Sequence, residues 1–175
     1  DVEESNGLAA NASASEDEQR RIEEREREIA ACLVSIVSRN PRFRSKAAER
    51  LGELRAGAEA LTEALRDQNE FVRAAAAQSL GSTLEKATPE AVDGLLSCLD
   101  DKNDFVCSAA IRTLGRLRAE GCIEEMEPFL EDRNPHIISD ALIALGRMNA
   151  QNLVERITQF LEHENSHISA AAAQA

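Results

Sequence analysis

Residues 69–81 read NEFVRAAAAQSLG, residues 103–115 read NDFVCSAAIRTLG, and residues 134–146 read NPHIISDALIALG. Aligned on their asparagines, all three have an apolar residue three places on, alanine seven places on, and Leu-Gly eleven and twelve places on. The pattern begins again at Asn40 and at Asn165, so successive asparagines are separated by 29, 34, 31 and 31 residues. Recurrence at this period predicts a protein built from about five structural repeats.

A second pattern precedes each asparagine. Apolar residues lie eleven, eight and four places upstream, and these spacings put them on one face of a helix. Each repeat is therefore predicted to consist of two helices, the second of which begins after the asparagine. The five upstream sets are Ile29, Cys32 and Ile36; Ala58, Leu61 and Leu65; Val92, Leu95 and Leu99; Ile123, Met126 and Leu130; and Val154, Ile157 and Leu161.

The asparagine suits the N-cap of the second helix, because its side-chain oxygen can accept a hydrogen bond from a free backbone amide of the first turn. Pro41 and Pro135 follow two of the asparagines, at a place where a helix tolerates proline. When the asparagine is counted as position one, we expect positions four, eight, eleven, twelve and fifteen to face the core. This set includes Phe43 at position four of the first repeat.

A single helix pair cannot bury its apolar stripe alone, so neighbouring repeats must stack to supply the core. The recurring alanine at position eight predicts that the helices approach closely. The predicted fold is all-α, a right-handed α-solenoid or superhelix of about five helix-pair repeats. We expect a disordered arm at 1–15 and a solenoid at 16–175, with repeats at about 16–54, 55–83, 88–117, 119–148 and 150–175.

Composition and charge narrow the classes of partner. Thirty-two acidic and 20 basic residues give a net charge of −12, whereas binding to a nucleic-acid backbone requires a basic surface. No stretch of about 18 apolar residues is present, so no membrane insertion is expected. The four cysteines form no CxxC pair and match no zinc spacing. We interpret them as small buried thiols and expect a reducing, cytoplasmic location.

The second-helix segments FVRAAAAQSLG (71–81), FVCSAAIRTLG (105–115) and HIISDALIALG (136–146) resemble those of HEAT repeats. Their short period resembles the HEAT-like subgroup named after phycobilisome (PBS) lyases, and the resemblance covers residues 22–175. It implies an armadillo-like helical solenoid whose second helices line a concave side. Members of the family include scaffolds, lyases and appended regulatory domains.

The subgroup carries arginine directly after the apolar residue of position four. Arg73 matches this feature and Arg44 stands in the parallel place, but Cys107, Ile138 and Ser169 replace the arginine later in the chain. The resemblance therefore implies no continuous ladder of Asp–Arg pairs beyond the second copy.

Positions three, six, ten and fourteen of the second helices point away from the core, because each residue turns the helix by about 100°. Position six is small in every repeat, which suits the floor of a groove. Two interpretations of Phe71 and Phe105 at position three stay open: anchors for a peptide or helix, or rings folded over the seam between repeats. The predicted partner-binding residues are Phe71, Phe105, His136, Gln78, Arg112, Arg116 and Arg147.

The sequence carries no phosphate-binding loop, no GxSxG and no HExxH, and His163 and His167 flank the Asn165 cap without sharing a helix face. We therefore predict no catalytic residue, metal or cofactor. The expected function is a non-catalytic protein-interaction scaffold or adaptor within a larger protein, with a protein or peptide partner of acidic character.

Two alternatives stay open for the function. One is a bilin-lyase-like enzyme or chromophore chaperone, in which Arg112, Arg116 and Arg147 would meet the propionates of a tetrapyrrole. The other is a structural domain that regulates an attached enzyme or transporter. The fifth copy stops at Ala175 before its Leu-Gly, which predicts either a continuation or an end-to-end homodimer through the open C-terminal repeat.

Overall fold

A computed structural model describes the backbone of residues 2–175 and the side-chain surroundings of residues 16–175. Every regular element in the described backbone is helical. The α-helices are α1 (Val2–Ser35), α2 (Pro41–Glu53), α3 (Ala58–Ala64), α4 (Glu70–Thr83), α5 (Pro89–Leu99), α6 (Asp104–Arg116), α7 (Ile123–Met126), α8 (Pro135–Arg147), α9 (Val154–Thr158) and α10 (Ser166–Gln174). Short 3₁₀ segments are η1 (Glu120–Cys122), η2 (Glu127–Glu131), η3 (Gln151–Leu153) and η4 (Gln159–Glu162).

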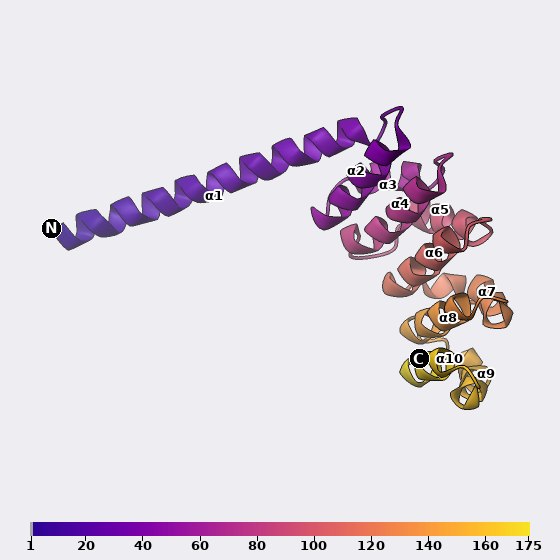
Figure 1. Ribbon diagram of the computed structural model, residues 1–175. Helices are drawn as coiled ribbons and strands as arrows, with labels where there is room; N and C mark the ends of the chain where they lie inside the picture. Colours follow the sequence, from indigo (N-terminus) through magenta and orange to yellow (C-terminus); the bar gives the residue numbers. More distant parts are fainter. Residues whose placement is uncertain (1) are drawn as a thin grey trace.

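The helices stack as five pairs in two layers. Helices α2, α4, α6, α8 and α10 lie side by side in one row, and each contacts the next (Figure 1). The elements that precede them in each repeat form the second layer, in which α3 contacts α4 and α5 contacts α6. The predicted all-α solenoid of helix pairs is confirmed.

The N-caps of the second helices are those predicted from the sequence. Each capping side chain accepts a hydrogen bond from the backbone N–H two residues further on, over 2.9–3.1 Å. These bonds satisfy donors that the first turn would otherwise leave free. The caps are Asn40, Asn69, Asn103, Asn134 and Asn165.

The predicted core is largely correct, because the alanine of position eight is buried in all five repeats and the leucine of position twelve in all four that have it. Phe43 is an exception, since 58% of its surface is exposed. It lies on α2, the first helix of the row, and no earlier second helix lies beside it to cover the ring. Arg50, at position eleven of the same helix, is exposed for the same reason.

The first helices of the last two repeats differ from the expectation of one continuous helix. In the fourth repeat α7 ends at Met126 and a 3₁₀ segment follows, because Pro128 cannot donate the next backbone bond. The fifth repeat breaks similarly without a proline. Val154 and Leu161, predicted to face the core, are 49% and 46% exposed, because α10 contacts α9 and η4 but no further repeat of the described chain lies on their other side.

The arm predicted at 1–15 falls on the part of the chain whose side-chain surroundings lie outside the described residues, and the boundary at residue 15 stays a prediction. The backbone of α1 begins at Val2 and runs into the stack, while its N-terminal half extends away from it (Figure 1). Arg25 donates to the carbonyl of Leu54 over 2.6 Å, and Arg50 donates to Glu28 over 2.6 Å. These bonds join α1 to α2 and to Leu54, the residue that follows α2.

All four cysteines are buried and free, as the sequence predicts. Burial raises the pKa of the Cys98 thiol to about 11 and that of Cys107 to about 12. Both thiols therefore stay protonated at neutral pH and behave as small packing groups.

Neighbouring second helices are in tight contact at the glycine of each Leu-Gly pair. A Cβ atom added at Gly115 would lie 2.6 Å from the Cα of Ala144, so no larger residue fits without moving a backbone. In every repeat the opposing residue is at position eleven of the next second helix and is small. The four contacts are Gly52 with Ser79, Gly81 with Thr113, Gly115 with Ala144, and Gly146 with Ala175.

We expect Gly115→Ala to lower the free energy of unfolding by about 1–3 kcal/mol, because the new methyl group would overpack the contact with Ala144. Urea unfolding followed by far-ultraviolet circular dichroism measures the effect. Gly121→Ala is the matched control, since a Cβ atom at Gly121 meets nothing within 4 Å. Equal midpoints for the two variants would show that the glycine contact is not what limits helix approach.

Candidate functional site

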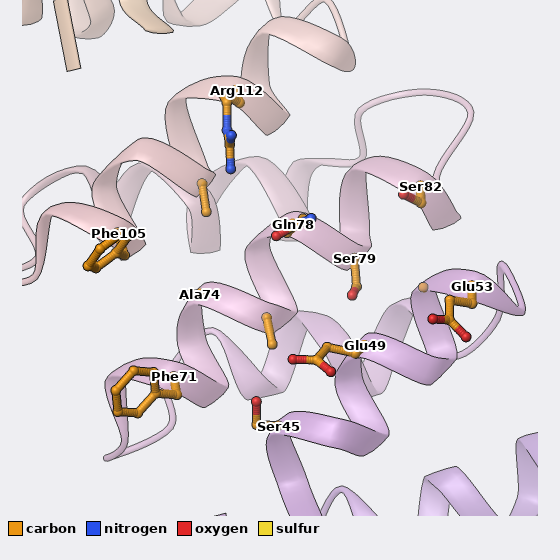
Figure 2. A pocket seen from close by; sticks show the side chains of 13 residues that line it. Ser45, Glu49, Glu53, Phe71, Ala74, Gln78, Ser79, Ser82, Phe105 and Arg112 are labelled. Carbon is orange, nitrogen blue, oxygen red and sulfur yellow. The ribbon is translucent and has the colours of Figure 1, made fainter. Parts of the chain in front are cut away.

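The second helices of the first three repeats form a groove of about 600 Å³. Its size falls in the usual range for ligand sites in proteins. Figure 2 shows side chains from α2, α4 and α6 around one hollow, with the two phenylalanines along one edge. The lining residues are Ser45, Glu49, Gly52, Glu53, Phe71, Ala74, Ala75, Gln78, Ser79, Ser82, Phe105, Ala109 and Arg112.

Small side chains form the floor of the groove. Ser45 and Ala74 at position six lie beneath the opening, as the sequence predicts for this position. The close contact of Gly52 with Ser79 adds a second small pair. Because these residues project little from their helices, the backbones of α2 and α4 form much of the floor.

Phe71 and Phe105 keep most of their surface in solvent, with 64% and 78% of each residue exposed. Each is the second residue of its helix, and its backbone N–H donates to the capping side chain of Asn69 or Asn103. The interpretation that the rings bury themselves in the seam between repeats is therefore wrong. Two exposed aromatic rings beside one groove are typical of a protein-binding surface.

The predicted site residues are divided between two parts of the row. Gln78 and Arg112 line the groove together with the two phenylalanines. Arg116 lies next to it, donating to the hydroxyl of Ser82 over 3.1 Å. His136 and Arg147 are exposed on α8, outside the groove lining.

Glu49 and Glu53 are the charged groove residues that the sequence analysis did not single out. They lie on α2, where Glu53 pairs with Arg50 over 2.5 Å. Glu49 occupies position ten and Glu53 position fourteen, so the same helical count that selected Arg112 and Arg116 could have found them. The groove is therefore acidic at its α2 end and basic at its α6 end.

A second hollow of about 450 Å³ lies beside the first and shares Ser45, Glu49 and Phe71 with it. Its remaining lining includes Arg42 and Lys46. The phenyl ring of Phe71 thus contributes to both hollows, and a ligand that contacts it can extend in either direction.

Two Arg–Asp pairs join neighbouring repeats near the N-terminal ends of the groove-forming helices. Arg44 donates to Asp67 over 2.6 and 2.7 Å, and Arg73 donates to Asp101 over 2.6 and 2.9 Å. Arg73 also donates to the carbonyls of Asp67 and Gln68. In the third repeat Cys107 stands in the arginine's place. The two Arg–Asp pairs, and the replacement of the arginine by cysteine in the third repeat, agree with the sequence analysis.

The two Arg–Asp pairs lower the pKa values of Asp67 and Asp101. The hydrogen bond from Arg73 holds the pKa of Asp101 below its ordinary value, aided by the backbone N–H of Asn103. Partial burial alone would raise the pKa of Asp67, but hydrogen bonds from Arg44 and from the N–H of Asn69 bring it below the ordinary value. Both carboxylates are thus ionised at neutral pH.

The acidic, histidine and cysteine side chains of the described chain are scattered over its surface and core. Among residues 16–175 no three His, Cys, Asp or Glu side chains gather in a way that could hold a metal ion. His163 instead stacks on Phe160 and accepts a hydrogen bond from the backbone of Asn165. No described helix combines the length and the apolar character needed to cross a bilayer.

Comparison with known families and structures places the fold. A family model described as HEAT repeats matches residues 27–115 and 58–141. No curated protein matches the sequence significantly.

Among solved structures, the chain is similar to one in "the complex of CpcE and CpcF of phycocyanin lyase from Nostoc sp. PCC7120", with a TM-score of 0.74 and 27% sequence identity. The match covers 83% of this chain and 62% of that one, so this chain spans less than two thirds of the lyase chain. An engineered protein matches with a TM-score of 0.64 and 18% identity, over 84% of this chain and 77% of its own. The latter likeness shows the fold alone.

We expect Arg73→Gln to lower the free energy of unfolding by about 1–2 kcal/mol at pH 7, since it removes a partly exposed pair and two bonds to carbonyls. Because the pKa of Asp101 is depressed, the pair's contribution is complete above the ordinary pKa of about 3.9 and is lost as pH falls below it. The difference from wild type should therefore shrink as the pH falls below about 4.

Denaturant unfolding at several pH values measures this difference. Exposed Arg66→Gln serves as the control, and its effect should stay within about 0.5 kcal/mol. A deficit for Arg73→Gln that is constant with pH would assign the stabilisation to the carbonyl contacts instead of the ion pair.

Proposed function

Because the chain belongs to the HEAT-repeat family, we propose that it is a protein-interaction module that binds a segment of a partner along the groove of α2, α4 and α6. Apolar side chains of the segment contact Phe71 and Phe105, and acidic ones contact Arg112 and its neighbours. The module acts as a scaffold or adaptor and performs no reaction of its own.

The observation that carries this proposal is the exposure of the two rings beside a groove floored by small residues. A phenyl ring gains by leaving water, and aromatic anchors at the centre of an interface often dominate its binding energy. Their helices are stacked through the glycine contacts and the Arg–Asp rungs, so the rings are held in place before a partner arrives. Such preorganisation lowers the entropic cost of binding.

We expect Phe71→Ser/Phe105→Ser to weaken partner binding by about tenfold or more, because two aromatic anchors are removed. Partners are captured from lysate of the source organism, identified by mass spectrometry, purified, and titrated by isothermal calorimetry. Phe43→Ser is the matched control: Phe43 is also 58% exposed, but it lines neither hollow. Its affinity should stay within about twofold of wild type.

All variants in this titration must show unchanged helical circular dichroism and melting temperature. A purified partner that binds the double variant as tightly as wild type would overturn the proposed groove function. Equal losses in the double variant and in Phe43→Ser would assign binding to the end of the stack near α2.

The likeness to a phycocyanin lyase chain favours a second function, that of a bilin-lyase-like enzyme or chromophore chaperone. In this alternative the exposed Arg112, Arg116 and Arg147 bind the propionates of a bilin. The chain contains no Tyr and no Trp, so Phe71 and Phe105 are the only aromatic side chains in the groove lining available for a large conjugated ligand.

We expect a linear tetrapyrrole to give no saturable change in visible absorbance when titrated with the chain, because two phenyl rings and a wide groove offer it little enclosure. Arg112→Glu/Arg116→Glu is the control. A saturable shift that wild type shows and this variant lacks would favour the lyase-like function over the scaffold.

An end-to-end dimer and the regulation of an attached enzyme or transporter stay predictions. A dimer contact through the C-terminal repeat would bury Val154 and Leu161, whose side chains are 49% and 46% exposed.

A further inference from the structure

Two columns of side chains along the groove change from acidic to basic in the same direction. At position ten the order is Glu49 on α2, Gln78 on α4 and Arg112 on α6. At position fourteen Glu53 on α2 is followed by Ser82 on α4, and then by the arginines of α6 and α8. The charge therefore varies along the stack, while the apolar rings lie along one edge (Figure 2).

Resting on the proposed function, we propose that the groove binds a segment of opposite charge at its two ends, in one orientation only. The basic end of the segment lies over Glu49 and Glu53, its acidic end lies over Arg112 and Arg116, and apolar side chains between them contact Phe71. The acidic character of the partner is thus confined to the half of the segment that faces α6 and α8.

The charged side chains at the two ends of the position-ten column, Glu49 and Arg112, are available to a ligand. Neither Glu49 nor Arg112 forms an ion pair among residues 16–175, and both side chains are exposed. They are separated by the whole width of α4, so they do not neutralise each other (Figure 2). A ligand with complementary ends would pair both of them at once.

The other charges near α2 modify this polarity without reversing it. Arg50 neutralises part of the charge of Glu53 through its hydrogen bond. Arg42 and Lys46 line the second hollow and do not line the main groove. Of the charged side chains that line the main groove, the two at α2 are acidic and the one at α6 is basic.

A segment bound in the reverse orientation would place its acidic end over Glu49 and its basic end over Arg112. Both ends would then meet like charges, which is how charged interfaces reject a wrong register. Because these charged side chains are exposed, each one alone adds little to the binding free energy, and salt screens its interaction with the ligand. The orientation preference arises from their sum and should amount to about tenfold in affinity at low ionic strength.

Three synthetic peptides of one composition test the proposal. The first carries three lysines, four leucines and three glutamates in blocks, the second has the same blocks in the reverse chain order, and the third has the charges scrambled. Fluorescence anisotropy measures their affinities at two salt concentrations. The better of the two block peptides should bind about tenfold more tightly than the scrambled peptide, and added salt should reduce this ratio.

A nitroxide label on the acidic end of the better peptide reports orientation through broadening of assigned amide signals. With wild type, the broadened signals should belong to α6. The variant Glu49→Arg/Glu53→Arg/Arg112→Glu/Arg116→Glu keeps the net charge at −12 but reverses both columns. With this variant the broadening should move to α2. Glu49→Arg/Arg112→Glu, which spares the Arg50 contact, serves as a second test should the fourfold variant be unstable.

The outcomes separate this proposal from the proposed function. Equal affinity of block and scrambled peptides, or broadening that stays at α6 in the reversed variant, would each overturn the polarity. The groove function would still stand if a purified partner depends on Phe71 and Phe105. Block peptides that bind equally well to Phe71→Ser/Phe105→Ser would overturn both, because binding would then lie outside the groove.

Discussion

The tight contact between consecutive second helices, glycine against a small residue, is the constraint on which the rest of the structure depends. Gly52, Gly81, Gly115 and Gly146 each meet position eleven of the next repeat. Because these residues project little from their helices, the surface between neighbouring second helices is hollowed. A residue of ordinary size at position three then stands well above this hollowed surface. The exposed rings beside the groove are thus a consequence of the same packing that holds the stack together.

The groove lies at the end of the stack where the repeats are also joined by ion pairs. The pairs of Arg44 with Asp67 and of Arg73 with Asp101 join the first three repeats, whose second helices form the groove. Farther along, Cys107 replaces the arginine, and Ser108 donates to Asp140 over 2.5 Å instead. The first helices of the last two repeats are also broken by 3₁₀ segments. The fourth and fifth repeats are joined by a different arginine, Arg156, which pairs with Glu127 and Glu131. The part of the solenoid with unbroken first helices and Arg–Asp pairs therefore carries the candidate site.

Periodicity predicted which face of each helix is inward, because core packing forces apolar and small residues into fixed positions. It could not predict what covers a helix at either end of the row. Phe43 follows the core pattern yet is exposed, and Val154 and Leu161 fail in the same way at the other end. The groove residues follow from the same count, but Glu49 was missed because an acidic residue on an acidic protein looks like ordinary solvation. Its significance depends on the α6 arginine across the groove.

The helix dipole accounts for some of the charged residues near the groove but not for others. A helix C-terminus carries partial negative charge, which favours arginine in the last turn. Arg116 and Arg147 occupy that turn of α6 and α8, so the helices themselves already favour basic residues there. Glu53 is the last residue of α2 and is disfavoured by the same dipole, although Arg50 compensates for part of the cost. The acidic end of the groove is therefore the part that helix stability does not explain, and the part that a basic ligand group would stabilise.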